Sequence, residues 1–446
     1  MSAETIYALS TVFGKSGVAV IRISGSKVLD ILSKITTIDV KNIKSRYAYY
    51  TKVKDINTQE IIDHPLVLYF RGPNSFTGED TAEIQCHGSK AVLNSILENL
   101  SKCTETRLAE PGEFSKRAFY NQKMDLTEAE GLADLIDAET SEQQKYAIRQ
   151  MEGNLKNLYT SWRSDLVRIL SYLEAFIDFP DEDIPENLKD DILNTVFKVR
   201  KEINQHLQGN NVNERLRNGF RIVIAGSANA GKSSLINTLT QRNAVIVSDI
   251  AGTTRDAIDI NLDIKGYPIV ITDTAGIRET NNPIEKQGIE IALQRISDAD
   301  IVIALYDASE DENNTFSEIR GYEDKIIYVA NKIDKISSDK LNSILAQNHI
   351  AISAKYNQGI DKLTDIILQQ IQDKFSSCSN YLITRVRYRE ALTDCLENLN
   401  IFNLDKEIEL SAEDIRLSCR AIGKITGTVE VNEILNNIFG SFCIGK

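Results

Sequence analysis

The chain has 446 residues, of which 42% are hydrophobic and 26% charged, and its formal net charge is −13 at pH 7. This balance is ordinary for a globular protein with sizeable cores, and at roughly 100–200 residues per domain it predicts two to four domains. The acidic charge argues against a generally basic nucleic-acid binder, although it leaves room for a local basic groove.

The composition also indicates where the protein works. No run of about 18 apolar residues occurs, so we expect no membrane-spanning helix. Residues 1–9 lack a basic stretch followed by an apolar one, which argues against a secretory signal. None of the six cysteines forms a C-x-x-C pair, and free thiols are the norm in a reducing compartment. We therefore expect a cytoplasmic protein without a membrane partner.

Residues 1–119 predict an α/β domain. Val18–Ile23 and Leu66–Phe70 are short apolar runs with glycine, proline and serine nearby, which is typical of strands. Ala91–Leu100 has the spacing of a helix.

Residues 120–217 predict helices, because leucine and isoleucine recur at helical spacing over 155–173. A break at Pro180–Pro185 precedes a second helical stretch over 186–208. The chain is again helical over 376–446. Since each half alone would expose an apolar face, we expect the two halves to form one discontinuous helical domain.

Residues 218–375 are predicted to be a domain inserted between these halves. Short apolar strands alternate with helices here, which predicts a parallel sheet covered by helices. Lys265-Gly266 joins two of the runs and predicts an antiparallel hairpin. The strand candidates are Phe220–Ala225, Ile258–Ile264, Tyr267–Thr272, Ile301–Tyr306, Ile326–Ala330 and Ile350–Ile352.

A glycine-rich motif follows the first of these strands and precedes a predicted helix. It reads G-x-x-x-x-G-K-S from Gly226 to Ser233. Glycines let backbone N–H groups close on phosphates, and a helix N-terminus adds a favourable dipole. We predict that Lys232 reaches the β- and γ-phosphates and that Ser233 ligates Mg²⁺. The predicted cradle comprises Asn229, Ala230, Gly231, Lys232, Ser233 and Ser234.

A second motif, Asp273-Thr-Ala-Gly276, ends a later strand. The Asp273 carboxylate is suited to hold Mg²⁺ through water, and the Gly276 N–H can sense the γ-phosphate. Between this motif and the glycine-rich loop, Thr254 is predicted to complete the Mg²⁺ coordination when GTP is bound.

Two further motifs select the base. In Asn331-Lys332-Ile-Asp334, the Asp334 carboxylate can accept both N1–H and N2–H₂ of guanine. Adenine offers an acceptor at N1 and would leave that carboxylate unpaired, so it is rejected. In Ser353-Ala354-Lys355, a backbone N–H can meet guanine O6. The four motifs predict a GTP-binding domain of the Ras-like P-loop type.

One position departs from Ras-like GTPases. They place a water-orienting glutamine directly after D-T-A-G, where this chain has Ile277. An isoleucine cannot hydrogen-bond water. No arginine finger is identifiable, although Arg255 and Arg278 are candidates. We therefore expect a cation or a partner to supply the missing charge.

The whole chain resembles the tRNA wobble-uridine modification GTPase family, MnmE (also called TrmE). Several long stretches carry the resemblance in the same order along the chain. They are Glu4–Thr11, Val18–Gly25, Ser75–Gly88, Glu110–Thr140 and the terminal Cys443-Ile-Gly-Lys446.

The resemblance implies a folate-binding N-terminal domain that dimerises, a helical domain built from both sides of the insertion, and a potassium-stimulated GTPase domain. Family members work with an FAD-dependent partner, MnmG, and a heterotetramer is expected. Together they install a carboxymethylaminomethyl or aminomethyl-type group at C5 of the tRNA wobble uridine. A tetrahydrofolate derivative is implied as the one-carbon carrier.

The resemblance also implies individual roles. Potassium would be held by Asn229 and by oxygens of Ser248, Ile250 and Thr253, and would take the place of the arginine finger. Glu285 would orient the attacking water indirectly, which answers the problem posed by isoleucine after D-T-A-G. The family usually has proline where this P-loop has Ala228, so a fixed φ is lost while the asparagine remains. Folate contacts would fall at Arg22, Glu83, Lys123 and Lys446.

Two other functions remain open. An RNA-binding or ribosome-assembly switch would need a dedicated basic module, and a membrane-remodelling GTPase would need a basic amphipathic helix or a lipidation motif. The sequence offers neither, so RNA modification is preferred. The run Arg385, Arg387 and Arg389 is equally compatible with tRNA phosphate contacts and with a solvated charged segment.

Overall fold

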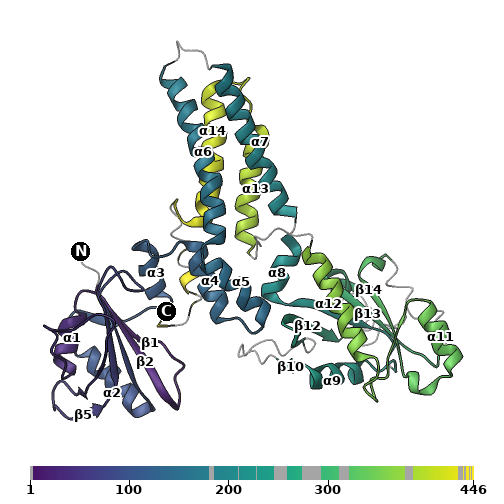
Figure 1. The fold of residues 1–446 in the computed structure, drawn as a ribbon, viewed down its shortest axis with the longest axis horizontal. Coiled ribbons are helices and arrows are strands. Elements are labelled where there is room, and N and C mark those ends of the chain that lie inside the picture. Colours follow the sequence, from purple (N-terminus) through teal and green to yellow (C-terminus); the bar gives the residue numbers. More distant parts are fainter. Residues whose placement is uncertain are drawn as a thin grey trace, which may run out of the picture. The chain divides into compact units, whose positions relative to one another are not determined.

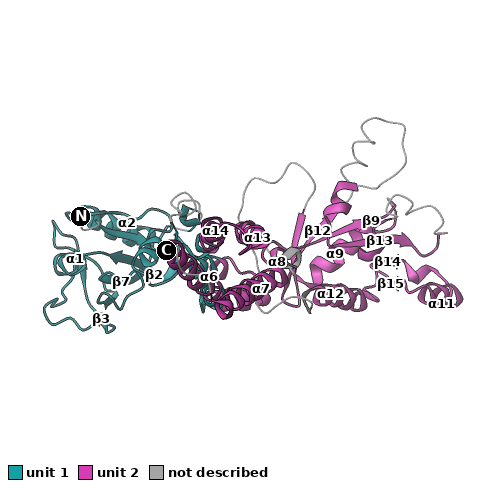
Figure 2. Ribbon diagram, turned by 90° about the horizontal axis from the view of Figure 1, so that it is seen from above, with its two compact units in different colours: residues 1–133, 151–160, 423–446 teal, residues 134–150, 161–422 magenta. Residues whose placement is uncertain are grey.

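The computed structural model in Figure 1 describes most of the chain. The described residues are 4–179, 185–208, 210–227, 229–245, 259–273, 293–310, 321–376, 385–429, 435, 438–440, 442 and 444–445. The chain divides into two compact units, which Figure 2 colours separately. Unit 1 comprises residues 1–133, 151–160 and 423–446, and unit 2 comprises 134–150 and 161–422. Within the described ranges, no helix combines the length and the apolar character that crossing a membrane requires.

Unit 1 is built on a six-stranded sheet of order β3-β6-β7-β2-β1-β8. Its strands are β1 (Thr5–Leu9), β2 (Ser16–Ser24), β3 (Ala48–Tyr50), β6 (Leu66–Phe70), β7 (Thr81–Gly88) and β8 (Thr106–Leu108). Helices α1 (Val28–Ile35) and α2 (Lys90–Ser101) bury their apolar sides in one core with Ile21, Ile23 and Ile84 of the sheet. A short hairpin of β4 (Val53–Lys54) and β5 (Ile61–Asp63) lies beside it.

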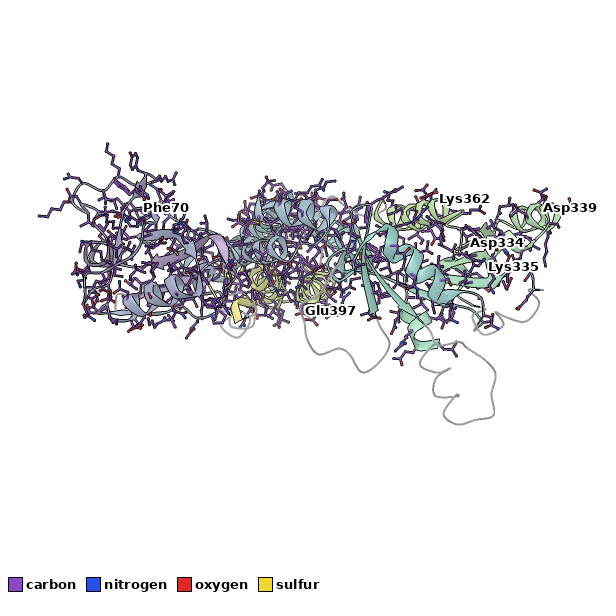
Figure 3. All side chains as sticks on the ribbon, turned by 90° about the horizontal axis from the view of Figure 1, so that it is seen from below. Phe70, Asp334, Lys335, Asp339, Lys362 and Glu397 are labelled. Atoms are coloured by element: carbon purple, nitrogen blue, oxygen red, sulfur yellow. The ribbon has the colours of Figure 1, made fainter. Side chains whose placement is uncertain are left out.

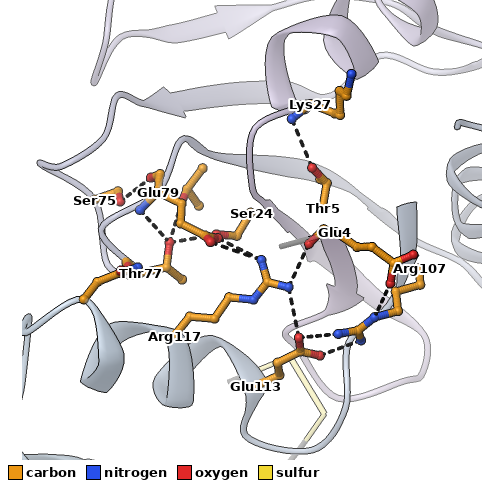
Figure 4. A network of polar contacts seen from close by, with 12 residues as sticks. Glu4, Thr5, Ser24, Lys27, Ser75, Thr77, Glu79, Arg107, Glu113 and Arg117 are labelled. Atoms are coloured by element: carbon orange, nitrogen blue, oxygen red, sulfur yellow. Dashed lines mark hydrogen bonds and ion pairs between the residues drawn. The ribbon is translucent and has the colours of Figure 1, made fainter. Parts of the chain in front are cut away.

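A buried ion-pair network fixes α3 (Glu113–Tyr120) on the other face of this sheet (Figure 4). The Arg117 guanidinium donates to Glu79 Oε2 at 3.0 Å, to Glu113 Oε1 at 3.0 Å and to the Glu4 carbonyl at 2.8 Å. Arg107 pairs with the same Glu113 at 2.7 Å. Removing one partner from such a buried network costs roughly 3–5 kcal/mol, so it holds the helix in one position.

The C-terminal segment of the chain returns to unit 1. Leu435, Phe439 and Phe442 pack against Leu126 and Ala129 of α4 (Leu126–Ile136). The last described residues reach the sheet: Ile444 forms a β-bridge with Pro111, and Ser10 Oγ donates to the Gly445 carbonyl at 3.0 Å.

Unit 2 contains the second sheet, of order β10-β11-β12-β9-β13-β14-β15. Neighbouring strands from β12 to β15 pair in parallel, whereas β11 and β12 form an antiparallel hairpin. Helices α9 (Lys232–Arg242), α11 (Ser338–Ala346) and α12 (Ile360–Ser376) belong to the same part. The strands are β9 (Phe220–Ala225), β10 (Ala244–Val245), β11 (Asp259–Ile264), β12 (Tyr267–Asp273), β13 (Ile301–Asp307), β14 (Ile326–Asn331) and β15 (Ile350–Ala351).

Long helices make up much of the rest of unit 2 (Figure 1). They are α6 (Asn154–Asp178, its first residues in unit 1), α7 (Glu186–Gln208), α13 (Val386–Ile401) and α14 (Ile408–Thr426). Trp162 Nε1 donates to Glu202 Oε2 at 2.7 Å between α6 and α7, and Ser418 Oγ donates to the Cys395 carbonyl at 3.5 Å between α14 and α13. Leucine and isoleucine at helical spacing fill the space between these helices, as the sequence predicts.

Asp300 ties together the two ends of the inserted sheet domain. Its carboxylate accepts from Arg215 Nε of α8 (Asn210–Asn218) at 3.0 Å and from the Arg221 N–H at 2.8 Å. Its carbonyl accepts from Lys374 Nζ, in the last turn of α12, at 2.9 Å. The chain thus enters and leaves the domain at one polar cluster.

The predicted fold class is confirmed. The N-terminal α/β domain, the helical domain and the inserted parallel sheet with one antiparallel hairpin are all present. The predicted strands Leu66–Phe70 and Phe220–Ala225 match to the residue. The boundaries at 119/120, 217/218 and 375/376 remain predictions.

Candidate nucleotide-binding site

The glycine-rich loop connects β9 to α9, as predicted. Gly231 precedes the helix with φ 96°, and a Cβ there would lie 2.4 Å from Nδ2 of Asn331. Only glycine fits this position, because both the backbone conformation and the free space exclude a side chain. No side chain caps the N-terminus of α9, and Ser233 and Ser234 are exposed there. An uncapped helix N-terminus with exposed hydroxyls suits a phosphate and a magnesium ion.

The Lys232 ammonium lies inside this loop. It is buried, at 6% exposure, and donates to the carbonyls of Gly226 and Ser227 at 2.9 and 3.1 Å. Backbone carbonyls are weaker partners for an ammonium than phosphate oxygens. The lysine predicted to reach the phosphates is therefore held at the loop.

The base-reading motif lies at the end of β14. Asn331 is buried and donates from Nδ2 to the Ala230 carbonyl at 2.8 Å, which joins this motif to the glycine-rich loop. Its Oδ1 accepts from the Ala354 N–H at 3.0 Å. One N–H of the Ser353–Lys355 segment, which is predicted to supply a backbone N–H to guanine O6, is thus engaged by Asn331 in this structure. Thr238 Oγ1 of α9 donates to the Ala354 carbonyl at 3.0 Å, so a second hydrogen bond holds Ala354 in place.

Asp334 follows in the short helix Ile333–Lys335, where it is exposed beside Lys335 (Figure 3). The Ser353 hydroxyl donates to Asp334 Oδ1 at 2.6 Å. The serine of the last motif therefore orients the carboxylate of the motif before it. This contact brings the two predicted base-reading segments together.

Lys332 joins three loops. Its backbone has φ 64°, and its ammonium donates to the Asn229 carbonyl at 2.6 Å and to Asp307 Oδ2 at 2.7 Å. Sequence reasoning missed Asp307. A carboxylate at the end of the otherwise apolar run IVIALY is the signal that could have found it, since a buried charge requires a partner.

The remaining predicted nucleotide residues are only partly visible. Asp273 ends β12 and its backbone pairs with Ile224 of β9, which places the start of D-T-A-G at the edge where the glycine-rich loop begins. The other predicted residues lie outside the described ones: Ser248, Ile250, Thr253, Thr254, Gly276 and Glu285, together with Ala228, Ile277 and both arginine-finger candidates.

The predicted folate residues belong to unit 1. Arg22 of β2 and Glu83 of β7 are cross-strand neighbours that form an ion pair of 2.9 Å, with side chains 19% and 21% exposed. The Arg22 guanidinium also lies 5.3 Å from the centre of the Phe76 ring and 5.7 Å from that of Phe114. These contacts show that Arg22 is not the simple surface charge that a strand-edge arginine could be.

The other two predicted folate residues are less defined. Lys123 is exposed just after α3, where its N–H donates to the Ala118 carbonyl at 2.8 Å. Lys446 lies outside the described residues, but Gly445 before it packs against the Leu9 carbonyl, at the end of the strand that pairs with Arg22. The structure thus brings Gly445 to the end of the strand next to Arg22.

Comparisons with known proteins identify the family. The sequence model for the GTP-binding protein TrmE N-terminus matches residues 5–123, and the one for the MnmE helical domain matches residues 126–443. The tRNA modification GTPase MnmE of Rickettsia prowazekii is 47% identical over 446 residues, covering 99% of this chain and 100% of that protein. MnmE of Orientia tsutsugamushi is 45% identical, covering 100% of both chains.

Two of the solved structures that resemble this chain cover part of it. The G domain of the Thermotoga maritima FeoB iron transporter is 27% identical with a TM-score of 0.28. The match covers 34% of this chain and 98% of the FeoB chain. Aquifex aeolicus Era, bound to GDP and AlF4, is 23% identical with a TM-score of 0.27, covering 42% of this chain and 68% of its own. The full-length relatives and the two family models together show that this chain belongs to the MnmE family of tRNA modification GTPases.

Proposed function

We propose that this protein hydrolyses GTP with Mg²⁺ and K⁺ and uses the cycle to drive modification of C5 of the tRNA wobble uridine. The observation that carries the proposal is the meeting of two loops at one edge of the seven-stranded sheet. Asn331 bonds the Ala230 carbonyl, and Lys332 bonds the Asn229 carbonyl, so the base-reading loop and the phosphate loop form a single site.

The phosphates would be held by the glycine-rich loop and the first turn of α9. Lys232 would exchange its two carbonyl partners for phosphate oxygens, which bind an ammonium more strongly. Mg²⁺ takes oxygen ligands, and the exposed Ser233 hydroxyl, Thr254 and, through water, Asp273 would supply them. The Gly276 N–H would contact the γ-phosphate.

Guanine would be read by Asp334, oriented by the Ser353 hydroxyl. A carboxylate fixed in this way accepts two N–H groups from guanine and none from adenine N1, so a bound adenine would leave it unpaired. The Ala354 segment would close the site around O6 once its N–H is released from Asn331.

Hydrolysis would depend on a potassium ion in place of an arginine finger. The Asn229 side chain is exposed on the glycine-rich loop and would share the ion with oxygens of Ser248, Ile250 and Thr253. A positive charge at this place stabilises the charge that develops on the transferring phosphoryl group. Glu285 would orient the attacking water, since the residue after D-T-A-G is an isoleucine.

The tRNA chemistry would involve unit 1 and a partner. Arg22, Glu83, Lys123 and Lys446 would bind a tetrahydrofolate derivative, which supplies a one-carbon unit when bound. An arginine fits a carboxylate-bearing ligand through its fork of donors. We further propose a homodimer, an FAD-dependent MnmG-type partner in a heterotetramer, and a cytoplasmic location. These proposals rest on family membership.

The test is the GTP hydrolysis rate of the purified chain in potassium and in sodium buffer at equal ionic strength. Potassium is expected to raise the rate by at least about tenfold, which is a conservative threshold beside the roughly 10³–10⁵-fold that an arginine finger supplies. Equal rates would reject the cation mechanism. Absence of GTP hydrolysis in either buffer, with Mg²⁺ present, would reject the proposed activity itself.

A further inference from the structure

Asp307 is a buried carboxylate whose two oxygens are both engaged. It ends β13, and its side chain is 6% exposed. Oδ2 accepts from Lys332 Nζ at 2.7 Å, and Oδ1 accepts from the Ser309 N–H at 2.9 Å and from Ser309 Oγ at 2.6 Å. A carboxylate held by three donors has no freedom to rotate, so it fixes the position of the ammonium it contacts.

The sheet sets this position. Asp307 and Asn331 are register partners at the ends of the parallel strands β13 and β14, and the Ala308 N–H donates to the Asn331 carbonyl at 2.8 Å. Lys332 comes directly after Asn331, in a left-handed backbone conformation with φ 64°. A lysine rarely adopts this conformation because it is strained, and the contacts of the side chain offset the strain.

The Lys332 ammonium has a second partner across the site, the Asn229 carbonyl at 2.6 Å. One ammonium therefore bridges the end of β13 and the glycine-rich loop. Burial opposes ionisation of Asp307, but the hydrogen bonds from Lys332 and Ser309 outweigh it and lower the pKa of the carboxyl. The Asp307 carboxyl is thus ionised at neutral pH.

We propose that Asp307 is a positioning residue for the nucleotide site. It fixes the Lys332 ammonium and, through that ammonium, the backbone of Asn229. The loop that reads guanine and the loop that carries the proposed potassium ligand are thereby held as one unit. The inference rests on the proposed GTPase function and assigns it a residue outside the recognised nucleotide motifs.

The test uses the full-length chain and the variant Asp307→Asn, which keeps the size of the side chain and removes its charge. Stopped-flow release of a fluorescent mant-GDP is expected to be about tenfold faster, the effect of roughly 1.4 kcal/mol. The potassium concentration for half-maximal hydrolysis is expected to rise severalfold, whereas the maximal rate at saturating GTP and potassium changes by less than about twofold. A purely structural carboxylate would leave the potassium dependence unchanged.

A double-mutant cycle decides whether Asp307 acts through Lys332. Lys332→Ala alone is expected to speed mant-GDP release at least as much as Asp307→Asn, and adding Asp307→Asn to it changes release by less than about twofold. Equal tenfold effects in both backgrounds would overturn the proposal. So would an unchanged potassium dependence in Asp307→Asn.

Controls separate this inference from the function beneath it. Asp361→Asn removes an ion pair with Arg242 in which the aspartate is 86% exposed, and it is expected to release mant-GDP like the parent. If Asp307→Asn lowers the melting temperature by more than about 5 °C, Ser309→Ala replaces it, since it removes the hydroxyl donor to Asp307 Oδ1 but leaves the backbone N–H donor and the charge. It should shift both readouts in the same direction, and no shift would count against the proposal. A parent chain that fails to bind mant-GDP would reject the proposed function, and a parent that binds with an additive cycle would reject only this inference.

Discussion

The Arg385 guanidinium donates a hydrogen bond of 2.7 Å to Oδ1 of Asp134, a residue 251 positions earlier in the chain. Arg217 Nε donates to the same oxygen at 3.0 Å. Arg217 lies in the last turn of α8, which precedes β9, and Arg385 is the N-cap residue of α13, so the two arginines flank the inserted sheet domain. One carboxylate of α4 thus holds both segments at which this domain joins the helices.

The corner of unit 2 formed by Asp134 of α4 and the start of α5 also contacts the β11–β12 hairpin. The Glu142 N–H, at the start of α5 (Ser141–Met151), donates to the Gly266 carbonyl at 3.1 Å. Strand β12 runs from this contact to Asp273, the candidate Mg²⁺ residue. The corner is therefore attached to the sheet domain at two separate places.

We predict that Asp134→Asn loosens this corner. The Asp134 side chain is 9% exposed and Arg385 16%, so removing the charge weakens a largely buried ion pair and costs about 1–3 kcal/mol. Hydrogen exchange of peptides covering 134–143 and 214–219 should become about tenfold faster. Asp191→Asn is the control, because its pair with Arg168 is about half exposed and contributes little. Unchanged exchange in Asp134→Asn would show that the ion pair does not hold the corner.

We predict that Gly231→Ala abolishes nucleotide binding. The added Cβ would lie 2.4 Å from Asn331 Nδ2, and the residue would need a left-handed φ of 96°. The resulting shift moves the loop at the point where the phosphates are expected. Isothermal titration with GDP should detect no binding. Gly321→Ala is a matched control, since Gly321 has φ 109° but nothing within 4 Å of its Cβ position. It carries the backbone strain without the clash, and GDP binding should persist.

The sequence predicted features carried by local patterns and missed those that depend on distant partners. Leu66–Phe70 and Phe220–Ala225 are continuous apolar runs, so their strands match to the residue. Strands β3 and β8 have three residues each and are defined by their neighbours in the sheet rather than by their own composition.

The same distinction holds for the site. The phosphate and guanine motifs are contiguous in sequence, so their residue types alone indicated the chemistry. Asp307 lies 25 residues from Lys332 in the sequence. The two residues can be recognised as a pair only when the register of β13 and β14 in the sheet is known. The arginine run was equally compatible with tRNA contacts and with a solvated segment. In the structure, Arg385 pairs with Asp134 and Arg389 with Glu214, so two of its members have structural partners.

We predict that Asp334→Asn shifts base preference from guanine towards xanthine. An amide presents a donor where the carboxylate accepts, and xanthine carries an oxygen at the position of the guanine amino group. The preference for GTP over XTP should fall at least about 100-fold, a change typical of a site built around a specific hydrogen bond. Competition of GTP and of XTP against mant-GDP measures this preference.

Asp339→Asn is the control. It changes an exposed carboxylate in the first turn of α11 and should keep the parent preference. A retained GTP preference in Asp334→Asn would contradict the assigned base contact.

We predict that the helical part of unit 2 loses stability in acid through His206. This residue is 5% exposed in α7 and packs edge-on against Trp162 at 5.6 Å, and burial lowers its pKa from 6.5 to about 4. Above pH 6.5 the imidazole is neutral in both folded and unfolded chains, so its contribution is constant. As the pH falls from 6.5 to about 4, the unfolded chain binds the proton first and stability falls, by on the order of 2–3 kcal/mol in total.

The measurement is hydrogen exchange of α6 and α7 peptides between pH 7 and pH 4, corrected for the intrinsic rates. His206→Gln, which does not titrate, should show a smaller pH dependence over this window even though it is less stable throughout. An identical pH dependence in parent and variant would mean that other groups govern the acid response.

We predict that deleting residues 443–446 abolishes tRNA modification and spares GTP hydrolysis. The last described residues lie against unit 1, where Ile444 bridges Pro111 and the Gly445 carbonyl accepts from Ser10, next to the strand that pairs with Arg22. The seven-stranded sheet and its loops belong to unit 2, so the nucleotide site should be intact. Mass spectrometry of tRNA nucleosides from cells carrying only the truncated chain should show unmodified wobble uridine, while the purified chain hydrolyses GTP within about twofold of the parent rate.

Lys446→Ala keeps the Ile444 bridge and tests the side chain alone, and it should also reduce modification. Fully modified uridine in the truncated strain would separate the C-terminus from the tRNA chemistry. A parallel loss of hydrolysis would mean that the deletion acts on the fold rather than on the proposed folate site.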